Sequence, residues 1–511
     1  MNALFAFAHR IRVPRVEGAQ VALFVLGCLV MMFGQHADAA SHMASQVTSE
    51  GDAASMVDAV AHGLDGARLP LLAGLPFAGM LLSIALFPIC ASRFWHHHYG
   101  KISAFWALAF LVPLVATAGW HTGIETVSHA LFAEYVPFIV LLTALYVVAG
   151  GIGVRGNLHG TPALNTVMLA IGTALASIMG TTGAAMLMIR PVLRANDHRR
   201  HRVHVVVFFI FLVANAGGAL TPLGDPPLFL GFLNGVTFGW TAVHLALPLL
   251  AVTIVLLAIF YALDTWFYRS REEERTAFLD PTPDTHAVRL EGKRNIPLLV
   301  LISGAVLMSG IWRPGIVFNI LGTGVELQNL VRDGVLIVIT VLSLAMTPRR
   351  VREHNAFDWA PIEEVAKLFA AIFLTISPVI AILRAGEQGG LASVIHLVND
   401  AQGEPVNIMF FWVTGLLSSF LDNAPTYLVF FNIAGGDAQH LMTEGARTLA
   451  AISAGAVFMG ANTYIGNAPN FMIKSIAQSR GVRMPGFFGY MMWSGAILLP
   501  VFVLMSVVFF R

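Results

Sequence analysis

The chain has 511 residues, of which 57% are hydrophobic and only 12% are charged, and its mean hydropathy is +0.73. A soluble domain carries about 25% charged residues, so this composition excludes a soluble globular protein, and many apolar runs of about 20 residues indicate a polytopic membrane protein. The formal net charge of +1, without a basic patch, gives no support to nucleic-acid binding, and two cysteines give none to a disulfide framework.

The N-terminus has the pattern of a secretory signal peptide. Three arginines precede the apolar stretch from Val21 to Phe33, and Ala37-Asp38-Ala39 supplies a small-residue cleavage motif. We therefore expect residues 1–39 to be a signal peptide and residues 40–69 to form an extracytoplasmic segment. An uncleaved first membrane helix is the alternative reading of the same pattern.

The first half of the chain contains four plain apolar spans and two interrupted ones. They lie at about 70–92, 102–121, 129–153, 161–195, 203–232 and 241–268. Gly180-Thr181-Thr182-Gly183 interrupts the fourth span, and the stretch from Asn215 to Pro227 interrupts the fifth. Irregular backbone at the depth of a bilayer is tolerated only where it is buried in protein or lines a wet cavity. We expect residues 70–268 to be a first repeat, followed by a hydrophilic linker at 269–294.

The second half has the same plan. Its spans lie at about 295–314, 334–347, 363–385, 405–434, 447–478 and 485–510. Asp422-Asn423-Ala424-Pro425-Thr426 interrupts the fourth of them, and Asn462-Thr463-Tyr464-Ile465-Gly466-Asn467 interrupts the fifth. We expect residues 295–511 to be a second repeat. Paired Gly/Pro-interrupted segments in two halves of a membrane protein are the sequence pointer to the binding site of a transporter.

One offset of 242 residues relates both pairs of interruptions. Between Ala214 and Phe229, seven of sixteen residues are identical to their counterparts 242 positions later, and Gly180 and Asp422 are separated by the same offset. Asp225 is matched by Asn467, so the repeat carries a carboxylate in one half and an amide in the other. An offset shared by both interruptions favours a true internal repeat.

Charge in the loops predicts how the repeats lie in the membrane. If each centrally broken span is a re-entrant hairpin that does not cross, each half crosses five times and the halves are inverted copies. Placing the linker in the cytoplasm then puts twenty Lys and Arg on the cytoplasmic side and six on the other, a strong positive-inside bias. We therefore expect an all-α, multi-pass protein of the bacterial inner membrane, with about ten crossings after the signal peptide.

The interruptions carry the side chains that bind hard cations. Broken helices expose backbone N–H and C=O groups at their ends, and carboxylate, amide, hydroxyl and carbonyl oxygens are the ligands that such cations prefer. The candidate ion-binding residues are Asp225, Asp422, Asn215, Thr221, Thr181, Thr182, Asn423, Thr426, Asn462, Thr463 and Asn467.

Asp225 and Asp422 are the two carboxylates in these interruptions. A charge at the centre of a bilayer costs about 2.5–3.5 kcal/mol, so an intramembrane carboxylate indicates function. Either a proton or a cation neutralises such a group, and competition between the two is the minimum requirement for cation/proton exchange. The structural alternative is that each aspartate caps the N-terminus of a half-helix ahead of a proline.

Two motifs resemble those of the ion transporter superfamily. They are Gly224-Asp225-Pro226-Pro227 and Asp422-Asn423-Ala424-Pro425-Thr426. Within the superfamily the chain is most similar to NhaD-type sodium/proton antiporters, whose neighbours are arsenite permeases and citrate or dicarboxylate transporters. The resemblance covers residues 70–511.

The resemblance implies inverted repeats that each contain a re-entrant hairpin and a broken helix, in a homodimer whose transport domain moves against a scaffold. It implies sodium at the hairpin tips, near Thr181, Thr182, Asn423 and Thr426, and at the broken helices, near Thr221, Asp225, Asn462 and Thr463. Carboxylate symporters of the superfamily carry Ser-Asn-Thr at both tips, whereas this chain has Gly180-Thr181-Thr182 and Asp422-Asn423-Ala424.

The sequence thus favours a sodium (or lithium)/proton antiporter, with sodium as transported substrate and no cofactor. A sodium-coupled citrate or dicarboxylate transporter is the first alternative, and a non-transporting membrane receptor or assembly factor is the second. No Walker motif, nucleophile elbow or zinc signature occurs in the sequence, so an ATP-driven pump or an enzyme is not indicated.

Overall fold

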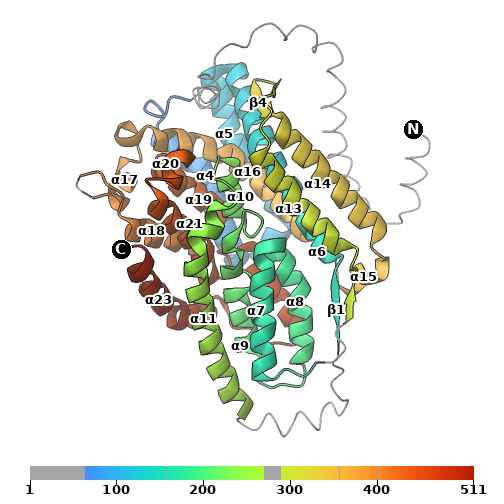
Figure 1. The fold of residues 1–511 in the computed structure, drawn as a ribbon. Coiled ribbons are helices and arrows are strands. Elements are labelled where there is room, and N and C mark those ends of the chain that lie inside the picture. Colours follow the sequence, from blue (N-terminus) through green and yellow to red (C-terminus); the bar gives the residue numbers. More distant parts are fainter. Residues whose placement is uncertain (1–63, 157, 270–288, 356, 401) are drawn as a thin grey trace, which may run out of the picture. The chain divides into compact units, whose positions relative to one another are not determined.

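A computed structural model describes residues 64–156, 158–269, 289–355, 357–400 and 402–511, and these ranges fold as an almost entirely helical protein (Figure 1). Eight of the described helices are long and apolar enough to cross a membrane, and two shorter apolar helices accompany them. The expected all-α polytopic fold is confirmed. The predicted signal peptide and most of the linker lie outside the described residues, and the number of crossings stays a prediction.

The first helices follow one another almost without interruption, and the first two long ones pack against each other. The short η2 (Leu71–Gly74) leads into α4 (Leu75–Cys90), and then α5 (Ser92–His129), the π-helical η3 (Ala130–Tyr135) and α6 (Val136–Gly150) follow one another without a loop. Gly119 has φ 89°, a conformation that a side chain disfavours, and it makes the kink in α5. The helix therefore extends well beyond the apolar span expected at 102–121.

The two interrupted spans of the first half fold as expected from their sequence. Helices α7 (Pro162–Met179) and α8 (Thr181–Ala195) pack side by side and are joined by Gly180 alone. The next span breaks into α9 (Val203–Leu212), the 3₁₀ turn η4 (Ala216–Leu220) and α10 (Pro226–Leu233), and α11 (Trp240–Arg269) completes the half.

The second half begins with paired strands and a helical hairpin. Strand β2 (Arg289–Glu291) pairs antiparallel with β1 (Gly153–Arg155), and β3 (Val317–Ile320) pairs antiparallel with β4 (Thr323–Glu326). The helices are α13 (Asn295–Ile311), α14 (Leu327–Met346), α15 (Arg349–His354) and α16 (Ala360–Arg384). Helix α14 starts seven residues before the apolar span expected from 334, because the protein buries the polar side chains of its first turns.

The remaining elements carry the second pair of interruptions. They are η5 (Gly386–Gln388), α17 (Ala392–Val398), α18 (Asn407–Phe420), α19 (Asn423–Ile433), α20 (Ala438–Met442), α21 (Ala446–Met459), η6 (Gly460–Asn462), α22 (Ala468–Ser479) and α23 (Phe487–Phe509). Helices α8 and α19 begin 242 residues apart, and so do α10 and α22. The offset found in the sequence is thus also the offset between helix starts.

Packing repeats in the same way. Helix α4 packs on α5 as α13 packs on α14, and α5 packs on α16 as α14 packs on α6. Helix α6 in turn contacts α8, whereas α16 contacts α19. Helices α8 and α19, each the second helix of a hairpin, therefore pack against α6 and α16. Helices α6 and α16 belong to a framework of α4, α5, α6, α13, α14 and α16, which come from both halves of the chain.

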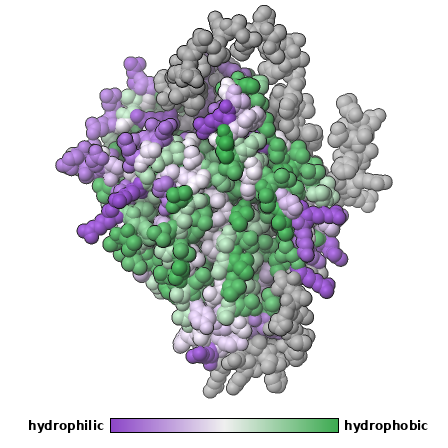
Figure 2. Space-filling model, in the orientation of Figure 1, coloured by the Kyte–Doolittle hydropathy of each residue, from purple (hydrophilic) through white to green (hydrophobic). Residues whose placement is uncertain are grey.

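The outer surface is strongly apolar. Figure 2 shows hydrophobic residues across the middle of one face, with hydrophilic residues gathered toward its margins. Exposed apolar side chains lie on several long helices, among them Phe105, Val112, Val243, Leu247, Val338, Met492 and Val508. Such a surface suits contact with lipid acyl chains, and the polar side chains of the interrupted spans are buried inside it.

Candidate ion-binding site

The tip of the first hairpin is a single glycine against the first broken helix. Gly180 has φ 80° and ψ 150°, which only glycine adopts without strain, so the chain can end α7 and start α8 at one residue. Thr181, the first residue of α8, donates its backbone N–H to the carbonyl of Gly224 at 2.8 Å. A backbone hydrogen bond therefore joins the hairpin tip to the break in the helix.

A threonine organises each break in the same way. The Thr221 hydroxyl donates to the Ser177 carbonyl and accepts from the backbone N–H of Leu223 at 3.2 Å. The Thr463 hydroxyl donates to the Ser419 carbonyl and accepts from the backbone N–H of Ile465, also at 3.2 Å. The two threonines and both of these partners are related by the 242-residue offset. Thr221 and Thr463 thus hold the extended backbone of the breaks, and neither hydroxyl is hydrogen-bonded to Asp225 among the described residues.

Asp225 lies at the centre of the candidate site and is only 2% exposed. Its Oδ1 accepts from the Thr181 hydroxyl at 2.9 Å and from Asn467 Nδ2 at 3.2 Å, and its Oδ2 accepts from Asn423 Nδ2. It stands at the N-cap of α10, but its side chain makes no capping hydrogen bond. The capping alternative is therefore wrong for Asp225, whose carboxylate points to three neutral donors instead.

The three donors come from both halves of the chain. Thr181 and Asn423 are each the first residue of a hairpin's second helix and are related by the 242-residue offset. Asn467 is the counterpart of Asp225 itself. The carboxylate thus lies where equivalent parts of the two repeats meet.

Asp422 has a different environment. It is half-buried, and its Oδ1 accepts from the backbone N–H of Ala424 at 3.1 Å, so it caps α19 as the structural alternative proposed. The Thr426 hydroxyl donates to the Asp422 carbonyl at 2.9 Å. Asp422 and Asp225 share no hydrogen-bond partner, so the two carboxylates differ in burial and in role.

Several oxygens near the second hairpin tip could hold a cation. The side-chain oxygens of Asn423 and Asn462 are buried and have no hydrogen-bond partner among the described residues. A Cβ on Gly466 would lie 2.6 Å from the Gly460 carbonyl oxygen, 2.7 Å from that of Ser418 and 3.1 Å from that of Ser419. Three carbonyl oxygens therefore converge at the second break, and the two unpaired amide oxygens belong to the hairpin tip and to the 3₁₀ turn η6; oxygens of these kinds suit a hard cation.

The other predicted residues lie around this centre. Thr182 is half-buried in the first turn of α8. Asn215 donates to the Ile210 carbonyl and to Asn470 Oδ1, both at 2.8 Å, and its own Oδ1 accepts from Asn467 at 3.3 Å. Asn215 therefore positions Asn467 and does not reach Asp225.

Sequence reasoning missed Asn470. Its Nδ2 donates to the carbonyls of Gly460 and Thr463, both at 2.9 Å, and its Oδ1 accepts from Asn215. It holds the second break from inside α22. The signal available in the sequence was a polar amide at a position whose repeat counterpart is the apolar Leu228, and in the structure Asn470 is fully buried.

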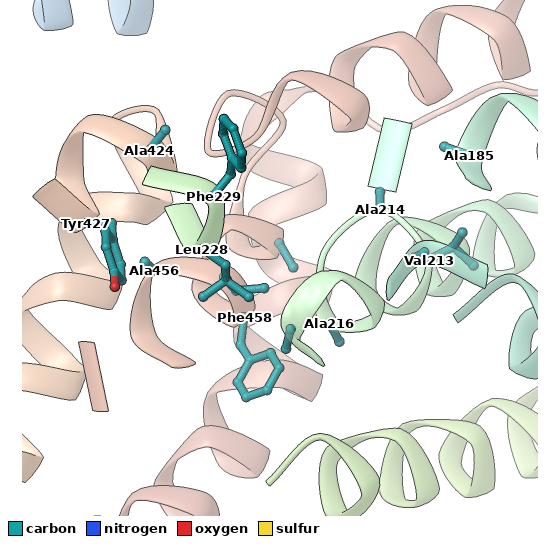
Figure 3. Packing of buried hydrophobic residues seen from close by; sticks show 14 of the residues in the cluster. Ala185, Val213, Ala214, Ala216, Leu228, Phe229, Ala424, Tyr427, Ala456 and Phe458 are labelled. Atoms are coloured by element: carbon teal, nitrogen blue, oxygen red, sulfur yellow. The ribbon is translucent and has the colours of Figure 1, made fainter. Parts of the chain in front are cut away.

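Apolar side chains seal the region around the site. Figure 3 shows Leu228 and Phe229 of α10 in one cluster with Tyr427 of α19 and Phe458 of α21. Close backbone approach is also required, because a Cβ on Gly218 would lie 2.7 Å from Thr181 Cγ2 and 2.9 Å from Asp225 Cβ. Tight apolar packing excludes water and strengthens any electrostatic interaction of the carboxylate.

Asp264 lies near the end of the apolar span at 241–268, and its side chain is fully buried. It lies 2.6 Å from Arg199 Nη2 and 2.7 Å from His204 Nε2, and it accepts from Asn165 Nδ2 at 2.9 Å. These groups join α11 to α7, to α9 and to the segment between α8 and α9. This is a structural ionic network, separate from the site at Asp225.

A known protein family matches residues 66–510, and its description is "Putative citrate transport". The chain belongs to this family. A 46 kDa membrane protein of Mycobacterium leprae is 25% identical over 328 residues, which are 63% of this chain and 71% of the relative. An uncharacterized transporter of Mycobacterium tuberculosis is 25% identical over 357 residues, 69% of this chain and 77% of the relative. Together with the apolar helices, these similarities support a multi-pass membrane transporter in the citrate-transport family.

Proposed function

We propose that this protein is a secondary active transporter that exchanges sodium, or lithium, for protons by alternating access, with Asp225 as the titratable cation ligand. The observation that carries the proposal is the carboxylate of Asp225, which is buried and receives hydrogen bonds from neutral side chains only. None of the ion pairs found among the described residues includes it. Sodium specificity also rests on the resemblance to NhaD-type antiporters.

The coupling follows from electrostatics. A buried charge without a counter-charge is costly, so a carboxylate in such a place is stable when it binds either a proton or a cation. The two ligands exclude one another because each neutralises the same group. Transport of a cation in one direction would then require return of the carboxylate with a proton.

The neighbouring groups fit both states. Thr181, Asn423 and Asn467 orient the carboxylate through three hydrogen bonds. The unpaired Asn423 and Asn462 oxygens, with the carbonyl oxygens around Gly466, could replace the water shell of a sodium ion. Asp422 sits at the same hairpin tip and adds a second negative charge that would attract a cation toward it.

A flux panel tests the proposal. The purified protein in proteoliposomes would be exposed to sodium, lithium, potassium and citrate across an imposed pH gradient, with an internal pH dye as the readout. We expect sodium and lithium to move protons in wild type and the Asp225→Asn variant to move none. Sodium-driven proton flux that survives in both Asp225→Asn and Asp422→Asn would contradict antiport through these residues.

Cation-coupled transport of citrate or a dicarboxylate is the second candidate, and the family description favours it. A carboxylate substrate needs a cationic group near its path. Arg190 of α8 is half-buried, and its Nη1 is buried without a hydrogen-bond partner among the described residues. Uptake of labelled citrate driven by a sodium gradient, lost in Arg190→Gln, would support this candidate over antiport.

The proposal places the protein in the bacterial inner membrane as a homodimer, without a nucleic-acid partner. The apolar outer surface supports the membrane location, and the family resemblance supports the dimer. Chemical cross-linking in native membranes tests the dimer, because a monomeric carrier would give no cross-linked species of twice the chain mass.

A further inference from the structure

Arg332 is a buried guanidinium that the proposed site does not use. It lies in α14, a helix whose outer side exposes Val335, Val338 and Val341, yet its own side chain is completely buried. Its Nε donates to Asp333 Oδ1 at 2.8 Å and its Nη1 donates to Asn329 Oδ1 at 3.0 Å. Its Nη2 is buried and has no hydrogen-bond partner among the described residues. A buried donor without a partner is costly and calls for an explanation.

The guanidinium faces the helix that carries the candidate site. Arg332 Cζ lies 5.9 Å from the centre of the Phe229 ring, within the range of a cation–π contact. Phe229 belongs to α10 and follows Asp225 by four residues. Residues four apart lie on the same side of a helix and about one turn, or 5.4 Å, apart along its axis.

We propose that Arg332 forms an ion pair with Asp225 in a second conformation of the transport cycle, in which α10 has shifted by about one helical turn against α14. Arg332 then competes with the transported cation for the carboxylate. The inference rests on the proposed function, since it assumes a carrier with two conformations. Arg332 contacts α10 through the Phe229 ring. Elements in contact can ratchet past one another by about one turn, and such a step would bring Asp225 toward the place that Phe229 now occupies.

Charge and hydrogen-bonding capacity both fit this exchange. In the present conformation Asp225 has three neutral donors and forms no ion pair among the described residues, whereas Arg332 is paired with Asp333 and keeps one guanidinium nitrogen, Nη2, without a partner there. A guanidinium placed against the carboxylate supplies the counter-charge that the cation otherwise supplies, and so it lowers the affinity of the site for sodium. The charge bias of the loops puts the start of α14 outside the cytoplasm, so release would be favoured on the extracytoplasmic side.

The experiment measures the sodium concentration for half-maximal flux separately on each side of oriented proteoliposomes. In Arg332→Gln we expect this value to fall on the order of tenfold on the extracytoplasmic side, with no change on the cytoplasmic side. Arg332→Lys keeps the charge and should retain most of the wild-type asymmetry. Arg313→Gln, which removes an exposed arginine from the loop before α14, is the matched control and should behave as wild type.

A second variant should change the extracytoplasmic sodium concentration for half-maximal flux in the opposite direction. Phe229→Leu removes the ring that holds the guanidinium in the present conformation but keeps both charged groups, so it should favour the Asp225–Arg332 pair and raise the extracytoplasmic value. It decides the question alone if Arg332→Gln does not fold. The inference is wrong if wild type shows sodium-driven flux but the variants leave the ratio of the half-maximal sodium concentrations on the two sides unchanged. Absence of sodium-driven flux in wild type would instead remove the proposed function and the inference with it.

Discussion

Asn467 donates a hydrogen bond from Nδ2 to Oδ1 of Asp225 at 3.2 Å, and these two residues hold the same position in the two repeats. Each is the residue before a half-helix that starts with a proline in its first two positions. The repeats therefore meet at a pair in which one member is an acid and the other its amide. This single substitution leaves one carboxylate where a symmetric protein would have two in contact, and two like charges so close disfavour each other strongly.

The pair predicts the behaviour of a swapped variant. Asp225→Asn should abolish sodium-driven proton flux, because an amide cannot exchange a proton for a cation. The double variant Asp225→Asn with Asn467→Asp moves the carboxylate by one hydrogen bond, into a position where the same neighbours can partly reach it. We expect it to regain measurable flux with a higher sodium requirement, measured with the pH dye in proteoliposomes.

Asn467→Asp alone is the control for that experiment. It creates two adjacent carboxylates, so it should bind one proton more tightly than wild type and shift the flux profile toward higher pH. Full wild-type flux in Asp225→Asn would contradict the central role of this residue, whatever the swapped variant does.

Close backbone approach at Gly218 gives a second prediction. A methyl group there would meet Thr181 Cγ2 at 2.7 Å and Asp225 Cβ at 2.9 Å, so Gly218→Ala must displace the hairpin tip from the carboxylate. We expect sodium affinity to fall about tenfold or more while the protein still inserts, since a displacement of this kind weakens ligand geometry. Gly304→Ala in α13 meets no atom within 4 Å and is the matched control. Equal affinities in the two variants would show that the tip tolerates displacement.

Asp422 offers a way to separate helix capping from charge. Asparagine caps a helix about as well as aspartate, whereas loss of a capping side chain costs about 0.5–2 kcal/mol. Asp422→Asn should therefore leave thermal stability in detergent unchanged, and Asp422→Ala should lower it. If the charge matters for the cation, both variants reduce sodium affinity to a similar extent. A loss of affinity in Asp422→Ala alone would mean that the residue acts as a cap.

The sequence predicts local features of this fold well, because they depend on residues close together in the chain. Gly180 marks the end of α7, and Asp422 marks the start of α19. The 242-residue offset also relates the start of α8 to that of α19, and the start of α10 to that of α22. Glycine conformation and proline placement determine such boundaries locally. The repeat offset then carries each boundary from one half to the other.

Contacts between the halves could not be predicted in the same way. The residues that surround Asp225 come from positions 44, 198 and 242 residues away, so their meeting depends on how the repeats pack. The sequence left helix capping open as the structural alternative to ion binding at Asp225, and only tertiary contacts showed that its side chain points away from the helix start. Asn470 was missed for the same reason, since its role appears only when α22 packs beside η6 and α9.

Asp264 supplies the last prediction, one of stability. Its side chain is fully buried against Arg199 and His204, and removing one member of such a buried network leaves an uncompensated charge at a cost of about 3–5 kcal/mol. Asp197→Asn breaks an ion pair with Arg202 whose aspartate is half exposed, and such pairs contribute only about 0–1 kcal/mol. We therefore expect Asp264→Ala to lower the thermal unfolding midpoint in detergent by several degrees and Asp197→Asn to leave it unchanged. Because the network holds α7 and α9 to α11 and shares no hydrogen bond with Asp225 or its donors among the described residues, sodium affinity per folded molecule should stay at the wild-type level. A loss of affinity without a loss of stability would instead make Asp264 part of the transport path.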